Sequence, residues 1–468
     1  MTLQTAIPAL TLLGGGPAGL AVAHYAQAAR VPFSLYERAD ETGGLCRTLR
    51  CGAHRYDTGA HRLHDRDPEI TRDLAALLGD ELVRVSAPSQ ILYRGKLLDF
   101  PPSPLGWLRS RGPGEAARTA LELLRARLLP RPERTFEDRA LNRYGRTLAG
   151  PLLLDYSEKL WGLPARELAP EVATRRLAGL SVASLFFELL GRKASHLDGQ
   201  FYYPRSGYGA IAERLAASLP ADSVHTGHEV NALECSGGNI RALGFAASPS
   251  QPPAALGRVP VEGRVVSTLP LPLLARLLGD ALPASAHAAA AQLRFRHVRL
   301  VFLRLSVARC SRNATLYLPD PKLCVSRVTE PKNRSAAMSP AHETSLVAEV
   351  PCSTGEPLAS LPEAELVRRV IGELAGAGLL DPATVLEWRA HFLPNAYPVY
   401  ARGFDRQVSI LRAALSRIGN LDLLGRSGLF WYSHLHDQLK LAKEYVTSRA
   451  QHAEAHPQVG EQAEPGPA

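Results

Sequence analysis

Residues 9–19 read ALTLLGGGPAG, a short apolar run followed by a GxGxxG spacing formed by Gly14, Gly16 and Gly19. The apolar run predicts a strand, and the alanine-rich residues 20–30 predict a helix that starts directly after the last glycine. Residues 33–37 predict a second strand. In such a βαβ unit the glycines permit a tight turn and let a pyrophosphate approach the backbone N–H groups at the helix start. The N-terminal segment therefore predicts a dinucleotide-binding α/β domain.

Glu37 ends the second predicted strand, where a carboxylate can accept hydrogen bonds from ribose hydroxyl groups. The next segment, residues 42–48, reads TGGLCRT. Its pair Gly43-Gly44 lets backbone pass close to a cofactor, and Arg47 can reach a phosphate. Taken alone, the glycine pair is also typical of an ordinary turn. Combined with the first motif, the segment resembles the second FAD motif of the flavin-dependent amine oxidase superfamily, which favours FAD over NAD.

The composition is that of a globular protein, with 46% hydrophobic and 21% charged residues in 468. It excludes disordered, collagenous and coiled-coil classes. The formal net charge is +9, and only seven of the 54 basic residues are lysines. Arginine holds oxyanions through a planar fork of donors, so part of the excess can serve an anionic ligand, while compositional bias is the simpler explanation for most of it. Because the basic residues are scattered, we expect no nucleic-acid partner.

The six cysteines stand far apart without a CxxC pair, which fits reduced thiols in a cytoplasmic protein and predicts no metal site. Residues 7–29 lack charge over a length that could cross a bilayer, but the internal glycine cluster argues against a transmembrane segment or signal peptide. The helix predicted within residues 118–131 has two interpretations. It can touch a membrane peripherally, or it can be a surface helix with arginine on its wet face. The sequence predicts no particular oligomeric state.

Five further segments match the same superfamily in order: YDTGAHR at 56–62, YSEKLWG at 156–162, FYYPRSGYG at 201–209, AYPVY at 396–400 and GRSG at 425–428. They resemble the branch of UDP-galactopyranose mutases and protoporphyrinogen-oxidase-like flavoproteins. The resemblance implies FAD as cofactor. It also implies an α/β fold, in which a Rossmann-like FAD-binding domain of the glutathione-reductase type carries a helical insertion and a second, mostly antiparallel sheet belongs to the substrate domain.

The expected division of the chain follows from this resemblance and from the local patterns. Helical periodicity dominates between about residues 107 and 190, and β-rich runs recur between 293 and 351. We expect the FAD-binding domain to comprise residues 1–85, 196–285 and 405–448. The substrate domain is expected to comprise strands in 86–105, a helical substrate or lid domain in 106–195, and a sheet in 286–404. The polar residues 449–468 are expected to form a disordered tail.

The resemblance also assigns cofactor-binding residues beyond the two glycine motifs. It implies that His61 lies near the flavin, that the Val230 backbone holds the adenine, and that Gly425 and Arg426 approach the flavin. Relatives typically read Tyr-Asn-Asn-x-Asp-His-Ser in the next segment, whereas residues 432–438 of this chain read YSHLHDQ. Without a gap His436 falls on the family's aspartate, and with a shift of one Asp437 does, so both are candidates for contacting the flavin.

On the substrate side the resemblance implies six positions. Tyr156 matches a tyrosine that packs on uracil, Trp161 a tryptophan beside the sugar, and Arg327 an arginine that holds a diphosphate. Arg175 or Arg176 falls where a mobile loop supplies a second arginine; Tyr397 and Tyr432 are further expected contacts. We expect the catalytic residues to be His61, Trp161, Arg327 and Tyr432. Each also has an ordinary structural interpretation: core packing for the two aromatics Tyr156 and Trp161, a hydrogen-bonded structural histidine for His61, and a solvated strand face for Arg327.

Three hypotheses about function follow. The first is an FAD-dependent oxidoreductase, similar to protoporphyrinogen oxidase and amine oxidases, that takes hydride from an anionic substrate such as a carboxylated C–H donor. The second is a non-redox isomerase of the UDP-galactopyranose mutase type, which uses reduced flavin N5 as nucleophile on a nucleotide sugar. The third is a flavin-binding module without catalysis. We favour the first, because Val350 follows Glu349 where mutases commonly carry tyrosine, and because the 432–438 segment is altered.

Overall fold

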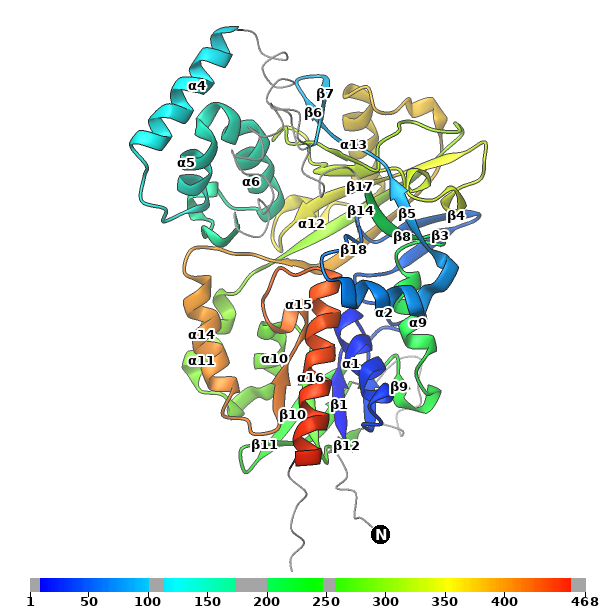
Figure 1. Ribbon diagram of the computed structural model, residues 1–468, viewed down its shortest axis with the longest axis vertical. Coiled ribbons are helices and arrows are strands. Elements are labelled where there is room, and N and C mark those ends of the chain that lie inside the picture. Colours follow the sequence, from blue (N-terminus) through cyan, green and yellow to red (C-terminus); the bar gives the residue numbers. More distant parts are fainter. Residues whose placement is uncertain (1–8, 101–112, 173–199, 247–256, 456–468) are drawn as a thin grey trace, which may run out of the picture.

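The part of the chain that the computed structural model describes comprises residues 9–100, 113–172, 200–246 and 257–455 (Figure 1). It forms a mixed α/β fold with a parallel sheet and a separate, mostly antiparallel sheet, which confirms the expected fold class. In Figure 1 the parallel sheet lies in the lower half of the molecule and the antiparallel sheet in the upper half. The helices α4, α5 and α6 form a group beside the upper sheet.

The parallel sheet has five strands in the order β19-β13-β1-β2-β9. Their bounds are Leu10–Leu13 for β1, Phe33–Tyr36 for β2, Val224–His225 for β9, Arg264–Ser267 for β13 and Leu421–Leu423 for β19. Leu12 belongs to the hydrophobic cluster that contains side chains of helices α1 and α16, whereas Leu13 belongs to the cluster that contains those of helix α10. Successive side chains of a strand point to opposite faces, so both faces of this sheet are covered.

The N-terminal βαβ unit has the expected strands, and its helix α1, Pro17–Ala28, begins earlier than the alanine pattern alone indicates. Pro17 occupies the first helical turn, where the missing N–H of proline costs no hydrogen bond and its fixed φ suits the helix. The glycine loop and the helix start therefore meet directly at the carboxyl end of β1. In a sheet of this kind, ligands bind outside the carboxyl ends of the strands.

A small antiparallel sheet adjoins the lower half. Its strands are β10, Val230–Ser236, β11, Asn239–Phe245, and β12, Arg258–Pro260. The turn between β10 and β11 is Gly237-Gly238, with φ of 59° and 73°, as the glycine pair predicts for a hairpin.

The second sheet has seven strands in the order β18-β14-β17-β16-β15-β6-β7, all antiparallel pairs except β15 and β6. The bounds are Ser89–Tyr93 for β6, Lys96–Asp99 for β7, Phe295–Leu305 for β14, Thr315–Tyr317 for β15, Arg327–Thr329 for β16, Thr344–Cys352 for β17 and Val385–Pro398 for β18. Every residue of β17 is buried, because it lies in the middle of the sheet with α12 and α13 near one face.

Two further two-stranded antiparallel sheets and the helices complete the fold. One is the hairpin of β3, Thr48–Cys51, with β4, His54–Asp57, and the other pairs β5, Leu82–Ser86, with the sequence-distant β8, Gln200–Pro204. The helices are α2 Pro68–Leu78, α4 Pro113–Leu128, α5 Phe136–Ala149, α6 Asp155–Trp161, α9 Ala210–Ala217, α10 Leu271–Leu278, α11 Ala284–Gln292, α12 Pro357–Ser360, α13 Glu363–Gly376, α14 Phe404–Leu415, α15 Gly425–Gly428 and α16 Leu435–Ala455. A π-helical turn, Gly150–Leu154, joins α5 to α6. Single 3₁₀ turns are Gly79–Glu81, Ala165–Glu167, Ala221–Ser223, Gly279–Ala281, Pro331–Asn333, Ala336–Met338 and Pro382–Thr384.

The expected disordered tail is wrong for residues 449–455, which belong to helix α16. Arg449 donates a hydrogen bond of 2.9 Å to Asp422, and the Tyr445 hydroxyl donates one of 2.7 Å to the same carboxylate. These contacts hold the last turns of the helix against strand β19. The composition of the tail could not reveal them, because Asp422 lies far away in the sequence. Residues 456–468 lie outside the described residues.

Three features of the described ranges concern membranes, metals and cysteines. No helix in them has both the length and the apolar composition needed to cross a bilayer. No group of three or more metal-ligating side chains was found in the same ranges. All six cysteines are free thiols, and only Cys310 is exposed.

Candidate active site

A cavity of about 650 Å³ extends from the carboxyl ends of the parallel strands to the antiparallel sheet. This volume lies within the usual range for small-molecule sites. One end of the cavity, here called the glycine end, is lined by Gly14, Gly16, Glu37, Gly44, Val230 and Thr268. The other, here called the arginine end, is lined by His61, Tyr156, Arg327, Glu349, Tyr397, Arg426 and Tyr432.

The three glycines of the first motif serve three different purposes. Gly14 has a φ of 101°, and a Cβ there would lie 2.4 Å from the Thr268 hydroxyl oxygen. A Cβ at Gly19 would lie 2.0 Å from the Gly14 carbonyl oxygen, so this glycine permits the helix to pack against the strand. A Cβ at Gly16 would meet no protein atom within 4 Å, and Gly16 lines the cavity. The missing side chain at Gly16 thus leaves space for a ligand rather than for the protein.

The start of helix α1 opens on the same space. Gly16 is its N-cap in an extended conformation, no side chain caps the helix, and no acidic residue lies in its first turn. Helix N-termini carry partial positive charge and free N–H donors, so an anion placed here is stabilised. The residues present therefore fit a phosphate-containing cofactor.

Glu37 and the second glycine motif form the adjoining wall. The Glu37 carboxylate accepts hydrogen bonds from the backbone N–H groups of Gly15, at 2.7 Å, and Ala39, at 2.9 Å, which fix its orientation at the cavity. Gly44 has a φ of 54°, and its Cβ would lie 3.2 Å from the Cα atom of Gly16. The second motif therefore packs directly on the first, and a larger residue at Gly44 would push them apart.

At the other end, Arg327 on β16 is held by two buried partners. Its Nη2 lies 2.7 Å from Oε2 of Glu349 and donates a hydrogen bond of 2.8 Å to the Tyr397 hydroxyl. Burial opposes the charge, yet the facing Glu349 carboxylate raises the pKa of Arg327 well above its ordinary value. Oε1 of Glu349 also accepts a hydrogen bond of 3.0 Å from the Ala60 N–H. Glu349 thus fixes both the arginine and the turn before His61.

Arg426 lies at the same end without comparable partners. Its guanidinium lies over the rings of Tyr432, at 4.5 Å, and Tyr397, at 5.0 Å. Its Nε and Nη2 are buried and have no hydrogen-bond partner among the described residues. Buried guanidinium donors without partners are costly unless a ligand supplies the acceptors. The arginine end is therefore suited to an anionic ligand.

His61 is stacked on Tyr208, with ring centroids 4.8 Å apart, and its Nε2 lies 3.0 Å from the Leu45 carbonyl oxygen. A carbonyl can only accept, so Nε2 carries the hydrogen. Burial, followed by the charges of Arg334 and Arg327, lowers the pKa of His61 to about 3. The ring is therefore neutral at pH 7, and Nδ1 is its remaining acceptor.

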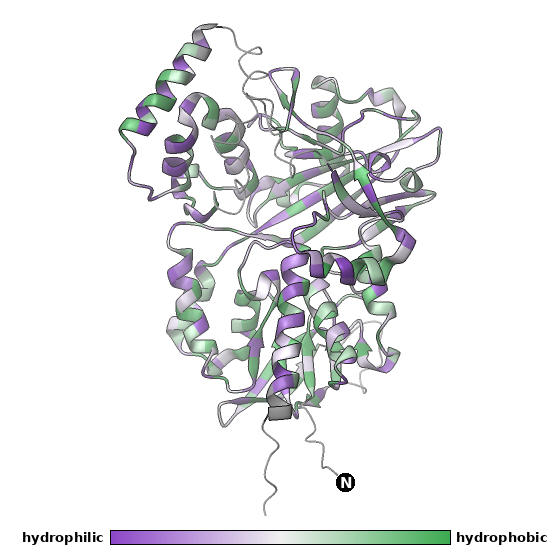
Figure 2. Cartoon of the chain, in the orientation of Figure 1, coloured by the Kyte–Doolittle hydropathy of each residue, from purple (hydrophilic) through white to green (hydrophobic). Residues whose placement is uncertain are grey.

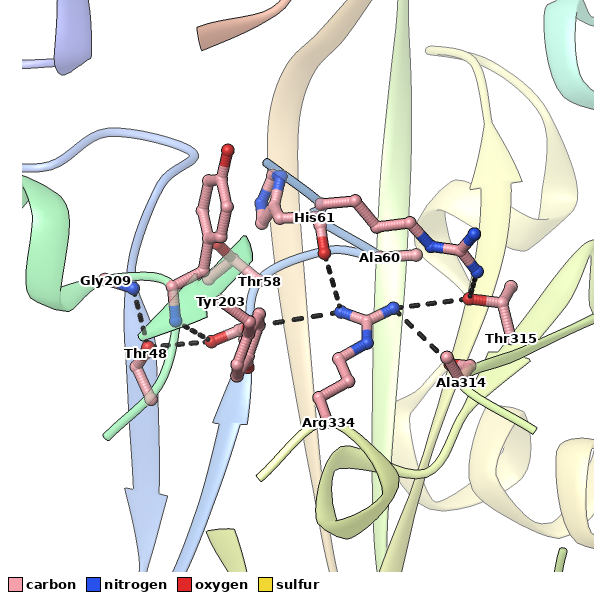
Figure 3. A network of polar contacts seen from close by, with 12 residues as sticks. Thr48, Thr58, Ala60, His61, Tyr203, Gly209, Ala314, Thr315 and Arg334 are labelled. Atoms are coloured by element: carbon pink, nitrogen blue, oxygen red, sulfur yellow. Dashed lines mark hydrogen bonds and ion pairs between the residues drawn. The ribbon is translucent and has the colours of Figure 1, made fainter. Parts of the chain in front are cut away.

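A buried network behind His61 fixes its position (Figure 3). Arg334 donates hydrogen bonds to the His61 carbonyl oxygen, at 3.1 Å, to the Thr315 hydroxyl, at 3.3 Å, and to the Ala314 carbonyl, at 3.4 Å. Its guanidinium also lies 3.9 Å from the Asp57 carboxylate. Arg334 thereby connects the segment after β16 with the histidine at the cavity.

Asp57 in turn accepts three hydrogen bonds, from the Tyr203 hydroxyl at 2.5 Å, the Thr48 hydroxyl at 2.7 Å and the Tyr208 N–H at 2.9 Å. Burial raises the pKa of Asp57, while Arg334 and these donors favour its charged form. The network therefore holds together the β3–β4 hairpin, strand β8 and the ring on which His61 is stacked.

A family model for flavin-containing amine oxidoreductases matches residues 17–407. The chain belongs to this family of flavin-containing amine oxidoreductases. Membership of the family implies a flavin cofactor, and the glycine end, with its uncapped helix start, fits the phosphate part of such a group.

Solved structures with the same fold include members of both groups named from the sequence. A reduced UDP-galactopyranose mutase has 19% identity and a TM-score of 0.80, covering 96% of this chain and 98% of that chain. A protein described as a protoporphyrinogen oxidase of Exiguobacterium sp. 255-15 has 20% identity and a TM-score of 0.73, covering 95% and 99%. A cyclohexylamine oxidase of Brevibacterium oxydans IH-35A has 14% identity and a TM-score of 0.65, covering 96% and 99%. At these identities the likeness establishes the amine oxidoreductase fold.

Most of the site residues expected in this flavin-containing amine oxidoreductase come together at the one cavity. Those lining it are Gly14, Gly16, Glu37, Gly44, His61, Tyr156, Val230, Arg327, Tyr397, Gly425, Arg426 and Tyr432. Gly19, Gly43, Arg47, Trp161, His436 and Asp437 are not among its lining residues. Arg175 and Arg176 lie outside the described residues.

The residues that do not line the cavity have identifiable places behind it. Gly43 donates its N–H to the Gly15 carbonyl at 2.8 Å, which ties the second motif to the first. Arg47 lies 3.9 Å from Glu41, a weak ion pair at the surface. Trp161 is buried behind the aromatic wall, with its ring 5.7 Å from that of Tyr432.

The first turn of α16 places neither of the two flavin candidates at the cavity. Asp437 accepts a hydrogen bond of 2.7 Å from the His434 N–H, which places its carboxylate at the start of the helix as in a capping box. The buried His436 points elsewhere, with Nε2 3.4 Å from the Thr71 hydroxyl. His434, Leu435 and Gln438 line the cavity instead.

Three residues that shape the arginine end, Asp57, Glu349 and Arg334, are not among the site residues expected from the sequence. Asp57 lies inside the YDTGAHR segment and Glu349 directly precedes Val350, so a sequence signal exists for both. Arg334 follows the segment around Arg327 and carried none, because its role depends on contacts with residues far away in the sequence.

Proposed function

We propose that this chain is an FAD-dependent oxidoreductase that acts on a small anionic substrate. The observation that carries the proposal is Arg426, a half-buried arginine whose buried Nε and Nη2 donors have no partner among the described residues and which lines the same cavity as the uncapped start of helix α1. One end of the cavity suits a dinucleotide and the other suits an anion, which is what a flavoenzyme with an acidic substrate requires.

In this proposal the cofactor is FAD, bound in a domain of the glutathione-reductase type. Gly14, Gly16 and the start of α1 would hold the pyrophosphate, Glu37 the ribose, and the Val230 backbone the adenine. When bound, the flavin supplies the capacity to accept a hydride from a C–H or C–N centre. Gly425, with a φ of 81°, lets the chain approach it closely.

The residues of the arginine end would bind and orient the substrate. Arg327 and Arg426 hold its anionic group through charge-assisted hydrogen bonds. Tyr397 and Tyr432 pack beside Arg426 and exclude water from it. His61 contributes a neutral ring whose Nδ1 can accept a hydrogen bond from the substrate, because Nε2 donates its hydrogen to the Leu45 carbonyl.

A second candidate is a rearrangement of a nucleotide sugar of the mutase type. It is favoured by Tyr156, Arg327 and Tyr432, which match mutase substrate residues in sequence and line one cavity. A diphosphate would satisfy the unpaired donors of Arg426 as well as a carboxylate would.

One experiment separates the two candidates. The purified protein is reconstituted with FAD, and product formation from UDP-galactose is measured for the oxidised and the dithionite-reduced enzyme. The oxidoreductase predicts no furanose product in either state and oxygen uptake with an anionic C–H or C–N donor. Furanose formed only by the reduced enzyme contradicts it and supports the mutase. A protein that binds no FAD after reconstitution contradicts both.

A further inference from the structure

Helix α4 carries an apolar stripe on the side that faces away from the protein. Leu121, Leu124 and Leu128 are 66%, 55% and 70% exposed, and Leu129 directly after the helix is 70% exposed. Residues spaced by three and four lie on one face of a helix, so the three leucines form a continuous stripe. Exposed leucines are ordinary when scattered, but a contiguous row of them marks an interaction site.

The opposite face of α4 is the one that holds it to the protein. Thr119 is buried, and the Glu122 carboxylate accepts a hydrogen bond of 2.7 Å from the Thr147 N–H of α5. In Figure 1 α4 lies at the outer edge of the molecule, beyond α5. Figure 2 shows hydrophobic and hydrophilic segments alternating along it. Within the described ranges the leucine stripe is left without cover, although the helix itself is firmly attached.

Arginines border the stripe on both sides. On a helical projection Arg118 and Arg125 lie along one edge of the leucines and Arg127 along the other. Arg118 pairs with Glu122 at 3.1 Å, whereas no described carboxylate pairs with Arg125 or Arg127. The surface-helix interpretation of the sequence places arginine on the wet face. The structure places leucine there, with the guanidinium groups at its margins.

We propose that α4 docks on an anionic lipid surface. An amphipathic helix with leucines between basic margins lies in the interface plane, where its apolar side chains enter the acyl boundary and its cations meet acidic headgroups. A second copy of this chain would bring a further set of arginines against the first, so charge complementarity favours the lipid. The inference goes beyond the proposed function and does not depend on the reaction at the cavity.

The test is flotation of the FAD-reconstituted protein with large unilamellar vesicles. Vesicles of phosphatidylcholine alone are compared with vesicles of phosphatidylcholine mixed with phosphatidylglycerol. We expect binding to the mixed vesicles, with Leu124→Ser weakening it by about tenfold and L121S/L124S/L128S abolishing it. Arg125→Gln with Arg127→Gln should weaken binding by about twentyfold, and added salt should do likewise. The matched control is Leu386→Ser, which replaces a leucine of similar exposure, 51%, on β18.

All these positions face solvent, so the variants are expected to fold, as thermal melting of each would verify. Failure of the wild-type protein to float with the mixed vesicles at low salt would overturn the proposal. So would flotation that the triple-serine variant leaves unchanged. A dimer seen by light scattering without vesicles, and lost in the triple-serine variant, would assign the stripe to a second copy and also overturn it.

Discussion

The two ends of the cavity are built in opposite ways. The glycine end consists of backbone and missing side chains, and its main segments lie within residues 14–44. The arginine end consists of buried charges and aromatic rings from segments as far apart as His61, Arg327 and Arg426. A ligand is selected at the first end by space and at the second by charge. Substitutions should therefore separate cofactor binding from substrate binding.

The largest effect is expected from Gly16→Val. A Cβ at this position meets no protein atom within 4 Å, and the φ of −74° suits any residue, so the fold is retained while the side chain enters the cavity. We expect flavin affinity to fall by about a thousandfold, equivalent to about 4 kcal/mol, measured by calorimetric titration of FAD. The control Gly372→Val introduces the same side chain at another uncrowded glycine, in α13, and should keep its flavin. Full FAD affinity in Gly16→Val would contradict the proposal that the glycine end binds the cofactor.

The network at the arginine end gives the next largest effect. Arg334→Met leaves the buried Asp57 carboxylate without its cation and releases the His61 carbonyl. Breaking a buried pair costs about 3 kcal/mol of unfolding free energy, measured by urea denaturation. Arg304→Met, which removes a more exposed arginine from Glu343, should cost about 1 kcal/mol. An equal loss of unfolding free energy in Arg334→Met and Arg304→Met would contradict the claim that Arg334 supports a buried network.

Arg426→Met tests whether Arg426 serves to bind a ligand even though its unpaired donors lower the stability of the folded protein. Removing the buried, unpaired Nε and Nη2 donors of this half-buried arginine should raise the unfolding free energy of the flavin-free protein by about 1 kcal/mol. Affinity for an anion should fall by about thirtyfold. Arg264→Met is the matched control, because Arg264 is fully paired with Asp422 at 2.6 and 2.7 Å and its loss should destabilise. Destabilisation by Arg426→Met would mean that this arginine supports the fold.

The effect that is smallest at neutral pH, and that grows as the pH falls, is the pH dependence set by His61. The pKa of His61 is about 3 in the folded protein and near 6.5 when unfolded, so the unfolded state binds the additional proton. Stability linked to His61 is therefore full above pH 6.5 and is lost as the pH falls towards 3. Below pH 6 the wild type should lose about 1.4 kcal/mol per pH unit more than His61→Gln, measured by urea denaturation. His342→Gln, at an exposed histidine, should keep the wild-type slope.

The glycine end could be predicted from sequence because its contacts are local. The GxGxxG spacing and Glu37 lie within one βαβ unit, and the two strands expected there are observed with bounds that differ by one residue. The error was at the helix start, where Pro17 extends α1 beyond the alanine pattern. Short-range chemistry fixes such features, and tertiary context has little opportunity to change them.

The arginine end was accessible only in part. Resemblance to a family pointed to Arg327 and Tyr397 on the substrate side and to Arg426 beside the flavin, and the structure brings all three to one cavity, but no pattern pointed to Arg334. The expected choice between His436 and Asp437 did not consider a third outcome, that one would cap a helix and the other face Thr71. Such roles depend on where a helix starts and on what packs against it, which one sequence does not specify.

The most direct test of the central claim, that one cavity holds a flavin at its glycine end and an anion at its arginine end, is a single titration. Inorganic diphosphate is added to the FAD-reconstituted protein, and the visible absorbance of the flavin is followed. The account predicts a saturable spectral shift in the wild type and its loss in Arg426→Met. A wild type without any shift, or the same shift at the same diphosphate concentration in Arg426→Met, would contradict it.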